Sequence, residues 1–178
     1  MGYFREASKE FRGYKIHQRA EGMEYHYRDL LKSPVISLLL ESEKPIIFHT
    51  GYKDEARVKN LTELINRTRS PIALAHAGDL IENDLTEISA CENVFIDISP
   101  LVSMLKCDFF ACSENRSLEL TELTMGGVLD YLENVFGNDK IVWGSDSPWC
   151  DNLIPNGYEA EVEAGRLINL THSTGTYL

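Results

Sequence analysis

Two histidines and one aspartate lie just beyond short apolar runs in this chain. His49 follows the run PIIF, His76 follows PIALA, and Asp146 follows IVW after the pair Gly144-Ser145. Short apolar runs that end in glycine or proline are typical of buried strands in a parallel sheet. The spacing therefore predicts three strands, each with a polar side chain at its carboxyl end.

Imidazole nitrogens together with a carboxylate suit Zn²⁺, and they also suit Mn²⁺ or Fe²⁺. A bound metal lowers the pKa of its water toward ~7, a carboxylate beside that water can take its proton, and a nearby imidazole can protonate a leaving group. One histidine at a strand end is more often a structural residue than a ligand. The repetition of the pattern at His49, His76 and Asp146 favours a functional site over coincidence.

Other polar residues lie near the same predicted strand ends. Lys15 and His17 belong to a weaker strand candidate at 14–17, and we assign them as candidate substrate-binding residues. Asp97, near the end of the run NVFIDIS, is a candidate cap for the loop that follows, with Ser99 close by. We expect His26 and His172 to be structural or surface histidines, and Trp143 and Trp149 to be packing groups.

Helical periodicity separates the strand candidates. Apolar residues recur at three- and four-residue steps in five segments, and these predict helices at 35–43, 54–65, 80–91, about 118–136 and 159–170. We interpret 18–32 and 100–116 as loops, and 1–13 as a helix end or loop. About five strand–helix alternations predict parallel strands with right-handed crossovers, so the polar strand ends should converge on one face.

Composition narrows the class of protein. The 178 residues suggest a single domain, 1–178, and 43% of them are hydrophobic. A formal net charge of -11 argues against nucleic acid or an anionic membrane as a partner. No apolar run approaches the ~20 residues of a membrane helix, and the N-terminus has charges where a signal peptide needs an apolar core. The four cysteines have no CxxC spacing, so we expect reduced thiols and a cytoplasmic location.

The stretches GYKIHQ, PIIFHTG, IALAHAG, NVFIDIS and KIVWGSDSPW, in this order and spacing, resemble the amidohydrolase-related branch of the metal-dependent hydrolases. The resemblance covers roughly residues 10–150 and implies an α/β fold, a partial (β/α)8 TIM barrel made of strands four to eight. It implies that His49 is the metal ligand of strand five. His76 would be a second-metal ligand or an acid/base and substrate-orienting group. Asp146 would touch the metal, most simply zinc, and activate water.

The chain departs from this family in one important respect. Family members carry a His-x-His pair of metal ligands on their first strand, and no His-x-His occurs in this sequence. About half of the barrel and of the ligand set are missing, so we expect a truncated gene, a lost site, or a half-barrel that needs another chain.

Three functional readings remain. The first is a metal-dependent hydrolase, or a decarboxylase of the same family, that acts on a small organic substrate. The second is a catalytically silent remnant or binding protein. The third is an unrelated open flavodoxin-like sheet, which no glycine-rich phosphate loop supports. Because the strands at 14–17 and 140–145 would be open edges, the second strongly apolar, we expect self-association or a complementing chain.

Overall fold

The computed structural model of the protein describes residues 10–17, 26–51, 53–107 and 124–171. Five parallel strands form one sheet in the spatial order β1-β2-β3-β4-β5, which is also their order along the chain. This sequential order agrees with the predicted partial barrel of strands four to eight. It contradicts a flavodoxin-like sheet, whose strand order reverses at a switch point.

The strands are short and in register. Their bounds are β1 Tyr14–Ile16, β2 Ile46–Phe48, β3 Ile72–Leu74, β4 Val94–Asp97 and β5 Ile141–Val142. One rung of the sheet joins Phe48, Leu74 and Ile96, and all three side chains are fully buried. Burial is greatest in β3 and decreases toward both edges. The central strands therefore anchor the polar residues that follow them.

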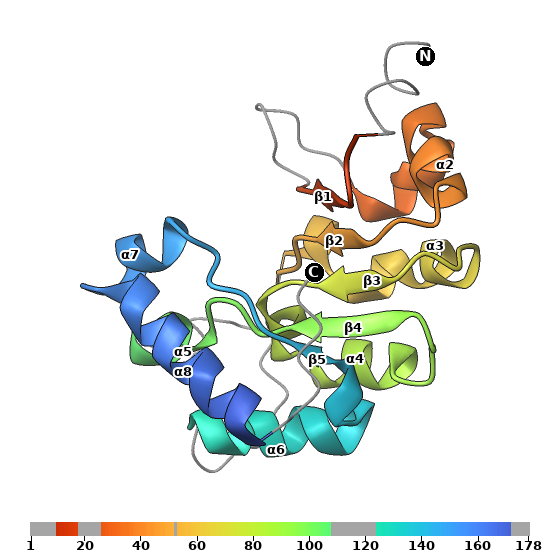
Figure 1. The fold of residues 1–178 in the computed structure, drawn as a ribbon. Helices are drawn as coiled ribbons and strands as arrows, with labels where there is room; N and C mark the ends of the chain where they lie inside the picture. The colour runs from red at the N-terminus through yellow and green to blue at the C-terminus, as the bar shows by residue number, and fades with distance from the viewer. Residues whose placement is uncertain (1–9, 18–25, 52, 108–123, 172–178) are drawn as a thin grey trace.

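Helices connect and cover the strands (Figure 1). The α-helices are α2 Pro34–Glu41, α3 Thr62–Asn66, α4 Glu82–Ile88, α5 Leu101–Lys106, α6 Met125–Phe136, α7 Trp149–Leu153 and α8 Gly157–Thr171. Shorter 3-10 turns are η2 Tyr27–Lys32, η3 Asp54–Ala56, η4 Val58–Leu61, η5 His76–Leu80 and η7 Asn138–Lys140. Within the described ranges, none of these helices combines the length and apolarity needed to cross a bilayer.

Several predicted boundaries were wrong. The segment 27–32, predicted as loop, is a 3-10 helix because Tyr27 and Leu30 turn inward and are buried. The single helix predicted at 54–65 is divided into η3, η4 and α3, with extended backbone at Arg57 between the first two. The predicted loop 100–116 begins with α5, and α7 was missed. The predicted loop at 18–25 and the start of the helix at 118–123 lie outside the described residues.

The carboxyl-terminal helices pack together beside β4 and β5 (Figure 1). Glu161 of α8 is buried, and its carboxylate accepts hydrogen bonds from the backbone N–H groups of Val102 and Ser103 at 3.4 and 2.7 Å. The Trp143 indole donates to the Glu161 carbonyl at 2.9 Å. Trp143 is thus a packing group, as predicted. In contrast, β5 is only half buried, although its apolar run predicts a buried strand.

Candidate functional site

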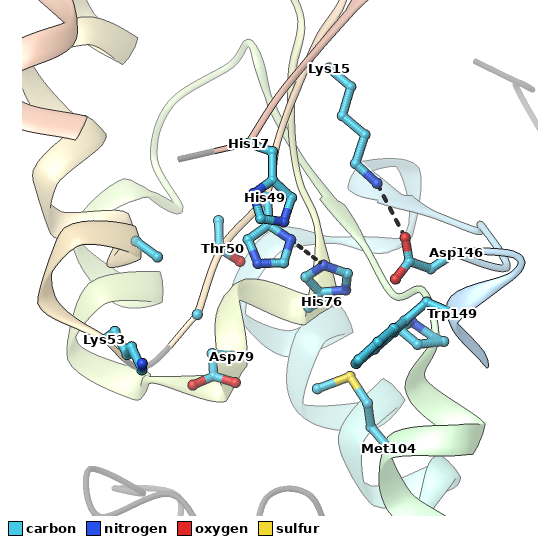
Figure 2. A pocket seen from close by; sticks show the side chains of 13 residues that line it. Lys15, His17, His49, Thr50, Lys53, His76, Asp79, Met104, Asp146 and Trp149 are labelled. Atoms are coloured by element: carbon cyan, nitrogen blue, oxygen red, sulfur yellow. Dashed lines mark hydrogen bonds and ion pairs between the residues drawn. The ribbon is translucent and has the colours of Figure 1, made fainter. Parts of the chain in front are cut away.

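One pocket of about 540 Å³ lies at the carboxyl ends of the strands. Every residue assigned from the sequence as a metal, catalytic or substrate group lines it, and Figure 2 shows their side chains gathered there: Lys15, His17, His49, His76 and Asp146. Lys15 lies in β1, and the others lie in the segments that follow β1, β2, β3 and β5. The parallel topology therefore brings together residues separated by as many as 131 positions.

Three histidines form a contiguous row in this pocket. The rings of His17 and His49 stack with centroids 3.9 Å apart, and the His49 and His76 rings meet edge to face at 4.6 Å. His49 Nδ1 and His76 Nε2 are 2.8 Å apart, and His76 Nδ1 is 2.7 Å from the carbonyl oxygen of Ser99. The row connects the edge strand β1 to the backbone beyond β4.

The hydrogen bonds indicate the tautomer of His76. Because a carbonyl oxygen can only accept, His76 Nδ1 carries a proton and donates it to Ser99. Burial lowers the pKa of His76, although the Asp146 carboxylate opposes this shift, so the neutral ring is favoured. Nε2 then holds a lone pair and accepts from His49 Nδ1. His76 is thereby oriented by the protein and presents a nitrogen lone pair within the pocket.

An unusual backbone turn follows His76. Five consecutive residues, 76–80, have φ between 51° and 60°, in the left-handed region. Only Gly78 adopts this region without a steric cost. The turn places both His76 and Asp79 on the pocket wall. This conformation explains why the helix predicted from Leu80 begins only at Glu82.

Asp146 lies on the other side of the pocket, where its carboxylate accepts a hydrogen bond from Lys15 Nζ at 3.1 Å. The Lys15 side chain is 48% exposed and that of Asp146 is 16% exposed. Asp146 has a positive φ of 52°, so the backbone turns sharply after β5. The pair is solvent-accessible and can exchange partners readily.

Two further carboxyl groups near the strand ends are buried. Asp97 accepts a hydrogen bond from Ser99 N–H at 2.9 Å and so caps its loop, as predicted. Burial raises its pKa to about 6, although hydrogen bonds from Ser99 partly oppose the shift. Burial likewise raises the pKa of Asp79 to about 7. No strong sequence signal marks Asp79, beyond its position three residues after His76.

The comparisons with known proteins agree with this geometry. A family model described as Amidohydrolase matches residues 4–170, which is most of the chain. The chain belongs to the amidohydrolase family. No curated protein matches this chain in sequence.

Solved structures with the same fold include an amidohydrolase and a putative hydrolase. An amidohydrolase from Burkholderia multivorans with bound zinc is 17% identical, with a TM-score of 0.64, and the match covers 97% of this chain and 63% of that one. The same protein with bound HEPES is 16% identical, with a TM-score of 0.62, and the match covers 94% of this chain and 61% of that one. A putative 2-pyrone-4,6-dicarboxylic acid hydrolase from Pseudomonas putida is 17% identical, with a TM-score of 0.58, and the match covers 94% of this chain and 60% of that one. The likeness concerns the fold, and the chain spans about 60% of the length of these relatives.

The side chains that line the pocket include the nitrogen and oxygen donors that a divalent metal binds. Two nitrogens on one tetrahedral zinc ion at ~2.0–2.1 Å each would lie about 3.3–3.4 Å apart, so the rings must separate slightly from the 2.8 Å between His49 Nδ1 and His76 Nε2 to share an ion. Asp146 lies nearby, but its carboxylate is paired with Lys15. In the part of the chain that the structure describes, no three His, Cys, Asp or Glu side chains surround a common point. The chain thus offers two adjoining imidazole nitrogens, of which His49 Nδ1 must give up its proton to bind a metal, and a carboxylate that must change partner.

An apolar wall completes the pocket. It consists of Pro100, Met104 and Trp149, and Figure 2 shows the Met104 and Trp149 side chains beside the polar groups. Trp149 is 53% exposed, so its assignment as a packing group was wrong. The polar residues Thr50 and Lys53 also line the pocket and were missed. A pocket with one reactive wall and one apolar wall suits a small organic molecule.

The remaining histidines and cysteines lie apart from this site. His26 is 3.4 Å from Asp54 and 2.8 Å from Arg28, and neither partner lines the pocket. His172 and Cys112 lie outside the described residues. Cys91, Cys107 and Cys150 are free thiols, as predicted.

Proposed function

We propose that this chain carries the His49, His76 and Asp146 side of a metal-dependent hydrolase site that acts on a small organic substrate. Family membership supports hydrolase chemistry, and a relative with bound zinc supports a divalent metal. The observation that carries the proposal is the convergence of these three side chains on one pocket, with His76 already oriented by the Ser99 carbonyl. Zinc is our first choice of metal, with manganese or iron as alternatives.

Each residue has a separate proposed task. His49 and His76 would hold the ion through ring nitrogens, and Asp146 would touch it and take a proton from the attacking water. The bound metal would supply Lewis-acid polarisation and a water of lowered pKa. Lys15 and His17, at the β1 end of the pocket, would bind the substrate. In this proposal Lys15 must release Asp146, which an exposed ion pair permits at little cost.

The test is the metal content of the purified protein and its variants. Elemental analysis should find zinc, manganese or iron in the intact chain. The His49→Ala and Asp146→Ala variants should lose it. His26→Ala is the matched control, because His26 lies outside the pocket and should leave the metal content unchanged. A metal content that is equal in all four proteins would contradict the ligand assignment.

We further propose that full activity needs donors from a second chain, either another copy or a complementing protein. The sequence contains no His-x-His pair, and among the described strands β1 and β5 each pair on one side only. Unpaired strand edges favour association with other chains. Light scattering over a concentration series should show association. A parallel assay with added zinc or manganese, following ester, lactone and amide hydrolysis and release of carbon dioxide, should show weak turnover by the isolated chain.

A further inference from the structure

We propose that Asp79 is a substrate-positioning residue that receives a hydrogen-bond-donating group of the substrate, a hydroxyl or an amine. The inference deepens the proposed function and rests on it for the identity of the bound molecule as a substrate. Asp79 lies on the wall of the same pocket as the histidines, and Figure 2 shows its carboxyl group among the other lining side chains. Neither the sequence pattern nor the likeness to known structures assigns it a role.

One oxygen of the buried Asp79 carboxyl group lacks a hydrogen-bond partner among the described residues. The residue is only 4% exposed, and its Oδ2 is buried with no hydrogen-bond partner in the described part of the chain. Buried polar groups in folded proteins are nearly always hydrogen-bonded, because an unpaired one costs free energy. A group retained at such a cost is best explained by a partner that comes from outside the chain.

The ordinary structural roles of a buried aspartate do not apply here. Asp79 precedes α4, but the N-cap position of that helix is Ile81 and no side chain caps it. The described residues place no lysine, arginine or histidine in an ion pair with Asp79. Asp84 provides a contrast within the same region. Its carboxylate is equally buried, and it accepts hydrogen bonds from Arg57 at 2.6 and 3.0 Å.

The backbone conformation also points to the pocket. In a turn with about three residues per repeat, positions i and i+3 lie on the same side. The left-handed turn 76–80 therefore presents His76 and Asp79 together, and both line the pocket. Left-handed geometry costs roughly 1 kcal/mol or more for each residue other than glycine, and such strain is concentrated at functional sites. Extended backbone would avoid the cost but would separate the two side chains.

The chemistry of the carboxyl group selects the ligand. An ionised carboxylate can only accept hydrogen bonds, so it needs a donor, and an ammonium group or a hydroxyl supplies one. Burial raises the pKa of this carboxyl to about 7. A hydroxyl group, which both donates and accepts, therefore suits either ionisation state. The reacting carbonyl of such a substrate would lie toward His49 and His76, with its donor group toward Asp79.

The first part of the test separates a structural role from a binding role. Asp79→Asn and Asp79→Leu should leave the melting temperature unchanged or raise it, because neither change removes a partnered group. The matched control is Asp84→Asn, which breaks a buried ion pair and should lower the melting temperature by about 5 °C or more. A comparable loss in Asp79→Asn would overturn the inference, since it would reveal a structural partner for Asp79.

The second part measures binding with isosteric probes. Pentanamide, 4-hydroxybutanamide and 4-aminobutanamide differ only in a terminal methyl, hydroxyl or amino group. Homologues one carbon shorter and one carbon longer vary the distance between the amide carbonyl and that terminal group. Titrations of the full chain at pH 8, followed by protein NMR, should show the hydroxyl or amino probe binding about tenfold more tightly than its methyl isostere. Comparison of the hydroxyl probe with the amino probe also shows which of these two groups donates the hydrogen bond to Asp79.

The variants decide whether Asp79 causes this preference. Asp79→Leu should abolish it, and Asp79→Asn should retain it for the hydroxyl probe but lose it for the amino probe. Equal binding of the isosteres, no binding of any probe, or a preference that persists in Asp79→Leu would overturn the inference. Because probe binding is measured without turnover, a failed metal assignment at His49 and Asp146 would be seen separately, in the elemental analysis.

Discussion

The two sides of the pocket are built differently. His49 and His76 follow the fully buried centre of the sheet, and each is fixed by hydrogen bonds that the protein itself supplies. Asp146 follows the half-buried edge strand β5, and its described partner is the exposed ammonium group of Lys15. The positions of the histidine rings are therefore preorganised, and metal binding requires only that the proton shared by His49 Nδ1 and His76 Nε2 leaves, whereas the Asp146 carboxylate must exchange its side-chain partner.

This difference has a physical origin in the topology. A central strand is held by neighbours on both sides, so the residue after it inherits a fixed position. An edge strand in the described sheet is held on one side only. We expect substitutions on the histidine side to weaken metal binding more than those on the aspartate side.

The largest effect is expected for His76→Ala. This change removes a proposed ligand and also leaves the Ser99 carbonyl and His49 Nδ1 without their partner. Zinc affinity should fall by about 100-fold, against about tenfold for Asp146→Asn. Isothermal titration with zinc measures both values, with His26→Ala as the control. An Asp146 variant that loses more affinity than the His76 variant would reverse the comparison.

The left-handed turn on the histidine side should be intolerant of change. A Cβ atom added at Gly78, where φ is 60°, would meet Leu85 Cδ2 at 2.5 Å. We expect Gly78→Ala to lower the free energy of unfolding by about 1–3 kcal/mol, from backbone strain and crowding. Gly126→Ala in α6 is the control, because nothing lies within 4 Å of its added Cβ. Denaturant unfolding of the two variants compares them directly, and equal stabilities would mean that the turn is not strained.

The pH dependence of the free energy of unfolding should reveal the ionisation of the buried Asp79 carboxyl group. The folded pKa of Asp79, about 7, lies above its ordinary value of 3.8. Between these values the unfolded chain releases the proton while the folded chain keeps it. Asp79 therefore makes the protein less stable as pH rises from about 4 to about 7, with a slope of up to about 1.4 kcal/mol per pH unit. Asp79→Asn should have a higher free energy of unfolding than the parent protein at pH 7.5, and the difference between the two proteins should become small at pH 4.5. An unchanged profile would place the Asp79 pKa near its ordinary value.

The smallest effect is expected for Lys15→Met on the aspartate side. Removing the ammonium group frees the Asp146 carboxylate for the metal, and an exposed ion pair is worth about 0–1 kcal/mol. Zinc affinity should rise by up to about fivefold, while substrate binding should weaken. Lys59→Met, which removes another exposed lysine that pairs with Asp54, is the control. A fall in zinc affinity would indicate that Lys15 supports the metal site.

The sequence was sufficient to predict the strand order and the convergence of His49, His76 and Asp146, because apolar runs followed by polar residues have a direct topological meaning. It was insufficient for the contacts that depend on close packing. Nothing in the sequence HAGDL indicates that its alanine, aspartate and leucine adopt left-handed backbone, so Asp79 was missed. Trp149 was misassigned because an aromatic side chain beside a strand end can face either the core or a cavity. The metal and substrate roles of the site residues remain predictions.

The two tryptophans of the chain lie in contrasting surroundings. Trp143 is partly buried, and its indole is hydrogen-bonded to the backbone of α8, whereas Trp149 is exposed on the apolar wall of the pocket. Their fluorescence should therefore divide into a shorter-wavelength emission that monitors the attachment of α8 to the sheet and a longer-wavelength emission that monitors occupancy of the pocket. Single Trp→Phe replacements would assign the two signals, and the protein would then carry its own optical reporters of folding and of ligand binding.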